Sequence, residues 1–304
     1  MILSHLYSSI LRGRWLIDLR FVDMSHDLLA QVISGNNRNI DSMETLSDRK
    51  PFTGLLDTGK EMKSSGTFTG EFPPESVAVV NMHDTMFKYG TYCSYGTTEV
   101  ANLIYEAANN KNISGVLLDV DSPGGCVDAV SPVTQALEYN RSMGKSSVAF
   151  CDQCASAALY ASLSCDEIVA SNQISAEFGS VGVMMSFMDY TKYYENLGIK
   201  QHTIYSNLSD YKNLPFEQAK KGNYDQIKSE SLDPIARNFQ DAVKTRRAGK
   251  IDLSVPGIIS GRMFYAEDAL KYGMIDHIGD QAFAINRVRT IRRQQAVKEY
   301  IQTL

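Results

Sequence analysis

The sequence predicts an α/β protein built from repeated β-α units. Apolar runs typical of buried strands alternate with segments of helical spacing from about Val77 to Ile278. Turn residues such as Pro-Gly-Gly separate the two kinds of segment. The chain has 304 residues and is 43% hydrophobic, so it can bury a full core. We therefore expect one main α/β domain with extensions at both ends.

Residues 1–75 are expected to form a leader and a flexible arm. After an apolar start, the stretch from Gly35 to Gly70 is polar and rich in Gly, Ser and Thr, as linkers are. The main domain then covers 76–283, and 284–304 form a basic helical tail.

Helices are predicted where apolar residues recur on one face. Such a face covers Glu99–Asn109, and another follows the Pro-Gly-Gly turn. A longer helix is expected over 224–244, with a bend at Pro234. Core packing is a sufficient account of all three faces.

Ser156 lies where an apolar strand pattern gives way to a helix start, in Cys154-Ala-Ser156-Ala-Ala-Leu-Tyr160. Backbone N–H groups in a first helical turn have no partner within the helix, so an oxyanion formed beside Ser156 would find donors in place. This arrangement predicts a nucleophilic serine. Taken alone, the small residues could equally serve packing.

A strand over Gly115–Val120 ends in Asp121-Ser-Pro-Gly124-Gly125. Glycine lets a backbone approach a substrate closely, so the Gly125 N–H is a candidate oxyanion donor. An ordinary strand-to-helix turn is the alternative interpretation.

Lys212 lies in a turn-rich stretch, between an apolar strand pattern and a proline. Most lysines are solvated surface charges. A neutral lysine can nevertheless activate a serine, provided that removal from water lowers its pKa by about three from an ordinary value of about 10.4.

A Ser-His-Asp relay would instead need a histidine within reach of the hydroxyl. The five histidines are His5, His26, His83, His202 and His277. His202, on an expected strand before Lys212, is the rival base. Ser25-His26-Asp27 is contiguous and cannot fold its side chains into one relay, and His277 is expected at the surface or in packing.

Together these segments resemble the signal peptide peptidase A family of serine peptidases, which shares the Clp/crotonase-like fold. The ordered series continues through Gly179-Ser180-Val-Gly-Val, Asn196-Leu-Gly-Ile-Lys, Tyr211-Lys212 and a final motif from Gly261 to Gly279. So long a series is not expected by chance.

The resemblance implies a role for each candidate. Ser156 is the nucleophile, Lys212 the general base, and the Ser180 hydroxyl orients the lysine. Gly125 and Ala157 supply the oxyanion N–H groups. Two features depart from the family: Ala157-Ala158 stand where envelope members have two glycines, and the interval from Ser156 to Ser180 is slightly longer, which could aim the Ser180 hydroxyl elsewhere.

Composition limits the partners. A net charge of −5 and a pI near 5.6 provide no general attraction for nucleic acid. No apolar stretch reaches the ~20 residues of a membrane span, and Arg12 and Arg14 follow the apolar start instead of preceding it as in a signal peptide. These features predict a cytoplasmic protein, and the resemblance to phage members of the family implies a host cytoplasm or a phage prohead.

The five cysteines are odd in number and fall in expected core elements, as reduced thiols do: Cys93, Cys126, Cys151, Cys154 and Cys165. Cys151 and Cys154 form a Cys-x-x-Cys pair, but no second pair or nearby histidine completes a metal site. We expect no cofactor and no metal.

The C-terminal tail combines basic residues with apolar ones at helical spacing, Ile285, Val288, Ile291 and Val297. It is either a solvated helix or a contact surface for a subunit or a nucleoprotein.

The sequence thus predicts a Ser-Lys endopeptidase that assembles into homo-oligomers, as relatives do. The leader around Ile10–Ile17 is similar to that of phage and prophage members, which process scaffold and capsid proteins. The alternatives are a cytoplasmic peptide-degrading protease, an acyl-CoA enzyme of crotonase type and a catalytically silent ring-forming assembly protein. The polar arm between Gly35 and Gly70 is expected to be a site of self-cleavage.

Overall fold

A parallel sheet organises the fold. The computed structural model describes residues 14–17, 54–90 and 95–302. Within them, β4 (Ser76–His83), β5 (Ile113–Ser122) and β7 (Ser146–Ala155) lie side by side and parallel at the centre of a nine-stranded sheet. The sheet order is β11-β9-β7-β5-β4-β2-β3, and β8 and β12 branch from β7. The strand predicted over Gly115–Val120 is confirmed as part of β5.

Beyond β7 the sheet divides. The first half of β7 pairs with β8 (Glu167–Ala170), which in turn pairs with β12 (His277–Ile278). The last residues of β7 pair instead with β9 (Glu177–Gly179), and β9 pairs with β11 (Met263–Tyr265). Because β9 meets only the end of β7, the residues after both strands lie together.

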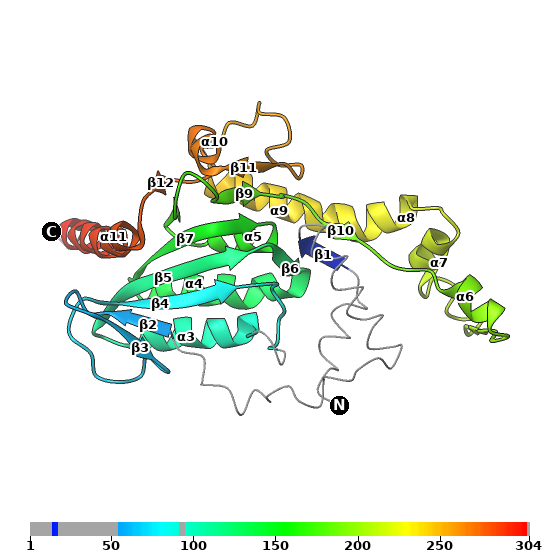
Figure 1. Ribbon diagram of the computed structural model, residues 1–304, viewed down its shortest axis with the longest axis horizontal. Helices are drawn as coiled ribbons and strands as arrows, with labels where there is room; N and C mark the ends of the chain where they lie inside the picture. Colours follow the sequence, from blue (N-terminus) through cyan, green and yellow to red (C-terminus); the bar gives the residue numbers. More distant parts are fainter. Residues whose placement is uncertain (1–13, 18–53, 91–94, 303–304) are drawn as a thin grey trace.

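Helices cover both faces of the sheet (Figure 1). One face packs against α3 (Thr97–Asn109), α4 (Val130–Ser142) and α5 (Ala157–Ser162), with a short 3₁₀ turn before α4. The predicted apolar faces of α3 and α4 are confirmed, since Ile104, Val133 and Leu137 are buried. Alternate residues of β4 point to the opposite face, where Val77 and Val79 meet α11 (Gln281–Gln302).

The C-terminal helix α11 packs on its own chain. Its predicted apolar positions Ile285, Val288 and Ile291 are buried against the sheet, whereas Val297 is exposed. Its arginines form ion pairs within the chain, with Glu167, Asp57, Glu75 and Glu299. Most of the predicted apolar surface is therefore an intramolecular contact, neither a solvated face nor a surface for another molecule.

A β-hairpin replaces part of the predicted linker. β2 (Gly54–Asp57) and β3 (Met62–Ser65) pair with each other, and β2 also pairs with β4. The turn between them forms because the Asp57 carboxylate accepts a hydrogen bond from the N–H of Gly59, whose φ is +80°. Leu56 and Phe68 are buried, so this stretch does contribute to the core. Residues 18–53, the rest of the expected arm, lie outside the described residues.

The predicted helix over 224–244 is present but irregular. It consists of α8 (Asp225–Ile227), a π-helical turn (Lys228–Leu232) and α9 (Asp233–Arg246). Pro234 is the second residue of α9, and it has no backbone N–H to donate to the carbonyl of Glu230. The predicted bend therefore takes the form of a π turn just before the proline. The short α10 (Ala266–Lys271) follows β11.

Two further features complete the description. A small second sheet places β1 (Arg14–Ile17) between β6 (Gly124–Cys126) and β10 (Met184–Met185). After β10, a segment with α6 (Thr191–Asn196) and α7 (Leu214–Lys220) extends away from the sheet (Figure 1). Among the described helices, none is long and apolar enough to cross a membrane.

Candidate active site

Ser156 occupies a strained turn between β7 and α5. Its backbone has φ 53° and ψ −113°, a conformation that costs a non-glycine residue about 1–3 kcal/mol. The Ser156 N–H donates to the carbonyl of Gly179 over 2.9 Å, and its carbonyl accepts from the N–H of Tyr160 at the same distance. The side chain makes no capping hydrogen bond to α5. A strained strand-to-helix turn whose hydroxyl does not cap the helix suits a nucleophile.

The Gly124-Gly125 backbone lies directly against this turn. A Cβ added at Gly124, whose φ is +97°, would stand 2.9 Å from both the carbonyl oxygen of Ala155 and the nitrogen of Ala157. The Gly124 N–H donates to the Ser122 hydroxyl, which donates to the carbonyl of Asp84. The structure thus places Gly124, the residue before Gly125, against the turn that holds Ser156 and Ala157.

Gly124 is the functional residue that the sequence analysis missed. It stands between Gly125 and the Ser156 turn, and only a residue without a side chain fits there. The sequence does mark this position, because Asp121-Ser-Pro-Gly-Gly contains two consecutive glycines, of which the prediction named only Gly125 as a donor.

Ser180 lies beside Ser156. Gly179 is the register partner of Ala155 in the parallel pair β7-β9, so Ser156 and Ser180 each follow the last paired residue of adjacent strands. The φ of Ser180 is 54°, and its N–H donates to the carbonyl of Arg262 over 3.1 Å. The interval that exceeds the family pattern therefore does not displace Ser180 from the Ser156 turn.

Lys212 is not brought to Ser156 within this chain. It lies in the turn between α6 and α7, and its side chain is exposed. Figure 1 shows that the segment with these two helices extends away from the sheet. Exposed apolar side chains surround Lys212 in sequence, with Leu208 93% and Tyr211 67% accessible. Within one folded chain, Ser156 therefore lies near the Gly124-Gly125 backbone, whereas Lys212 lies on the extended segment.

His202 and His277, two histidines in the described part of the chain, are not placed at Ser156 either. His202 is exposed on the same segment, in irregular backbone where a strand was expected, so that part of the prediction is wrong. His277 forms part of β12, close to Glu167 and to the ring of Phe283, in line with its predicted packing role. His5 and His26 lie outside the described residues.

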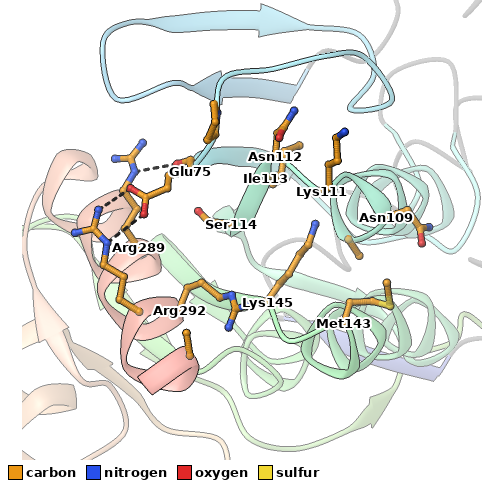
Figure 2. Close-up of a pocket in the computed structure, with 14 residues that line it drawn as sticks. Glu75, Asn109, Lys111, Asn112, Ile113, Ser114, Met143, Lys145, Arg289 and Arg292 are labelled. Atoms are coloured by element: carbon orange, nitrogen blue, oxygen red, sulfur yellow. Dashed lines mark hydrogen bonds and ion pairs between the residues drawn. The ribbon is translucent and has the colours of Figure 1, made fainter. Parts of the chain in front are cut away.

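A cavity of about 590 Å³ lies at the opposite end of the parallel strands from Ser156, beside Ser114 and Arg292 (Figure 2). Lys145 borders it, and its ammonium donates to the carbonyls of Ala107 and Asn110. Burial and, to a lesser extent, Arg292 lower the pKa of Lys145 to about 8. Because β7 runs from Ser146 to Ala155 between the two places, Lys145 cannot reach Ser156 to act as its base.

The Cys-x-x-Cys pair lies inside β7. Cys151 and Cys154 are free and fully buried, and burial raises the pKa of the Cys151 thiol. Thiols that are buried and protonated are poor nucleophiles and poor metal ligands. Over the part of the chain that the structure describes, no group of three His, Cys, Asp or Glu side chains could hold a metal ion. Cys93 lies outside that part.

Residues 139–295 match the model of peptidase family S49. The match covers more than half of the chain and includes Ser156, Ser180 and Lys212. The chain belongs to peptidase family S49. This confirms the resemblance recognised from the motifs.

Curated relatives include cellular and phage members of this type. The chain is 25% identical over 233 residues to Protease 4 of Haemophilus influenzae, covering 75% of this chain and 37% of that protein. It is 28% identical over 193 residues to a putative protease of Methanocaldococcus jannaschii, covering 62% and 60%. The capsid assembly protease C of Escherichia phage lambda is 24% identical over 189 residues, covering 61% and 41%. The chain thus spans less than two thirds of the length of each of these relatives.

Solved structures that are similar to this one include a mutant of the 1510-N membrane-bound stomatin-specific protease. It is 15% identical with a TM-score of 0.43, and the match covers 70% of this chain and 78% of that one. A member of the enoyl-CoA hydratase/isomerase family also has 15% identity and a TM-score of 0.43, covering 76% and 80%.

Proposed function

We propose that this S49 family member is a serine endopeptidase with a Ser156-Lys212 dyad. The observation that carries the proposal is the Ser156 turn, where a strained serine stands against the Gly124-Gly125 backbone and at the start of α5. Family membership supports peptide hydrolysis over the acyl-CoA chemistry of the crotonase alternative.

In the proposed mechanism, neutral Lys212 takes the proton of the Ser156 hydroxyl as the oxygen attacks a peptide carbonyl. The N–H groups of Gly125 and Ala157 hold the oxyanion of the tetrahedral intermediate. As the intermediate collapses, the ammonium of Lys212 gives its proton to the leaving amine and an acyl-serine remains. Water, deprotonated by Lys212, then attacks the ester and releases the second product with free Ser156.

Assembly is part of the proposal. The segment with α6 and α7 exposes Leu208 and Tyr211 beside Lys212, and none of the six residues of α6 is buried. Apolar side chains so exposed favour an interface. A homo-oligomer in which this segment covers the Ser156 site of a second copy would bury Lys212, and burial favours the neutral amine that the mechanism needs.

Mixing two inactive variants tests this arrangement. Ser156→Ala and Lys212→Ala, unfolded together and reassembled, should recover about a quarter of wild-type activity if serine and lysine come from different copies, since that fraction of sites receives both groups. Each variant reassembled alone is the control. No recovery would mean that both groups act within one chain.

For the substrate, we propose scaffold and capsid proteins of a phage head. The support is the similarity to the capsid assembly protease C of phage lambda. Incubation with capsid and scaffold proteins, followed by mapping of new termini, tests this substrate class. Cleavage of unrelated unfolded protein at the same rate would favour the peptide-degrading alternative, and no cleavage of either would favour the silent assembly protein.

A further inference from the structure

Strand β1 lies beside the Ser156 turn although it is far from it in sequence (Figure 1). It is the central strand of the small sheet, antiparallel to β6 on one side and to β10 on the other. Leu16 is the register partner of Gly125, and Ile17 that of Gly124. Leu16 and Ile17 are 0% and 4% exposed. The last two residues of this extended segment are therefore buried next to the proposed oxyanion donors.

The Gly125 amide faces this strand. On its other side, β6 bonds to Met86: the N–H of Met86 donates to the carbonyl of Gly124, and the N–H of Cys126 donates to the carbonyl of Met86. Successive N–H groups of a strand point to opposite sides. The N–H of Gly125 therefore points away from Met86 and toward Leu16.

The Leu16 carbonyl lies where a substrate carbonyl would be polarised. A Cβ placed on Gly124 would stand within 3 Å of the Leu16 oxygen and also of the Ala157 nitrogen. The same carbonyl thus lies near both amides that we assign to the oxyanion. An extended peptide that adds to a sheet edge is a common mode of peptide recognition.

The surroundings of Leu16 favour an apolar residue at this place. Leu16 borders a cavity of about 420 Å³ together with Val127, Val130, Tyr160 and Leu163. These residues come from the start of α4, the turn before it and the α5 region, which are the elements next to Ser156. Arg246 also lines this cavity, but it already forms an ion pair with Glu138 at 2.7 Å. A carboxylate buried at the Leu16 position would have to compete for that cation and would be disfavoured.

From these contacts we infer that β1 of the same chain occupies the groove between β6 and β10 in place of an extended substrate strand, with Leu16 at the position of an apolar substrate residue. This inference rests on the proposed function, because it takes Ser156 as the nucleophile. β1 has to leave before another peptide can enter, so the chain with β1 in place is blocked.

The rate at which a fluorophosphonate labels Ser156 tests the block in the full chain. Leu16→Asp should release β1 and raise the labelling rate at least about tenfold, with a smaller rise for Leu16→Ala, because the carboxylate cannot stay buried. Met62→Asp, on exposed β3, is the matched control and should react as wild type. Far-UV circular dichroism verifies that each variant is folded.

The outcomes separate the inference from the proposed function. If Ser156 stays unlabelled in every folded variant, including Leu16→Asp, the proposed function fails and the inference fails with it. If wild type, Leu16→Ala and Leu16→Asp are labelled equally fast, Ser156 is reactive and the occupancy by β1 is refuted.

A peptide in trans provides a second measurement. A synthetic peptide of residues 12–20 should slow labelling of the Leu16→Asp variant, and the same peptide with aspartate at the Leu16 position should not. Equal effects of the two peptides would contradict an apolar site at this position.

Discussion

Ser156 and Ser180 are the residues that follow two adjacent parallel strands, and both have a left-handed backbone, with φ of 53° and 54°. The Gly179 carbonyl before Ser180 accepts the N–H of Ser156, so the two turns are joined through the backbone. Strain at two neighbouring serines is maintained by the sheet that ends beneath them. Predictions for the site follow from this pair.

Ser156→Ala should abolish cleavage and probe labelling, a loss of at least about 10³-fold, because no other hydroxyl takes the place of the nucleophile. Alanine adopts the same backbone as serine, so the melting temperature should change little. Peptide hydrolysis and active-site labelling measure the effect, with Ser142→Ala on α4 as control. Full activity in Ser156→Ala would refute the assignment.

Lys212→Arg and Lys212→Ala should both cleave peptides at least about 10²-fold more slowly than wild type. The arginine variant is inactive because a guanidinium stays protonated and cannot accept the serine proton. Lys221→Arg, on the same exposed segment, should retain activity. The test compares initial rates of peptide cleavage. If His202→Ala is inactive while Lys212→Arg is active, the base is an imidazole.

Ser180 can be tested with two substitutions that remove the hydroxyl. Ser180→Ala keeps the backbone strain, whereas Ser180→Gly relieves it and should raise the free energy of unfolding by about 1 kcal/mol. Both should lower the cleavage rate about tenfold if the hydroxyl orients Lys212. Chemical denaturation and cleavage rates separate the two effects. A Ser180→Gly variant that is stabilised and fully active would leave Ser180 with a structural role alone.

Asp276 should make the free energy of unfolding depend on pH in the acidic range. Burial raises its pKa, but hydrogen bonds from Arg247 and Lys250 outweigh burial and hold the pKa below its usual value. A lowered carboxyl pKa stabilises the fold above the unfolded-state pKa of about 3.9, and this contribution is lost as the pH falls through the native value.

Asp276→Asn leaves the buried Arg247 without its anion. The substitution should therefore lower the free energy of unfolding by about 3 kcal/mol near pH 7. The difference in the free energy of unfolding between this variant and wild type should become smaller below about pH 4, where Asp276 of the wild type becomes protonated. Urea unfolding at a series of pH values measures both effects. A constant difference across the series would contradict the ion-pair explanation.

Self-cleavage of the N-terminal arm remains a prediction between Gly35 and Gly70. Residues 54–65 form the β2-β3 hairpin on the sheet, so we expect the cut before Gly54, where a protease can admit an extended chain. Mass spectrometry of the intact wild-type and Ser156→Ala proteins tests this prediction, because self-cleavage should truncate only the wild type. Identical truncation of both proteins would assign the cut to a host protease.

Much of the fold could be predicted from sequence because its signals are local. The apolar run of β5 and the helical spacing of α3 report which residues are buried whatever their partners are. The polar stretch after Gly54 has few apolar residues, so its sequence predicts a linker. It forms a hairpin because β4 offers an edge with which β2 can pair, and no local pattern reports that edge. The apolar face of α11 was visible, but not that its own sheet covers it.

The sequence by itself determined the chemistry of the candidate site: a serine at a helix start, a glycine pair after a strand, and a lysine in a turn, in an order that belongs to one family. Tertiary structure decided which of them meet. Parallel strands that end at one edge place Gly125, Ser156 and Ser180 together, whereas Lys212 lies on a segment that does not pack on the sheet. It also decided that Leu16 lies opposite Gly125, because pairing between distant strands depends on which edge is free and not on any local pattern.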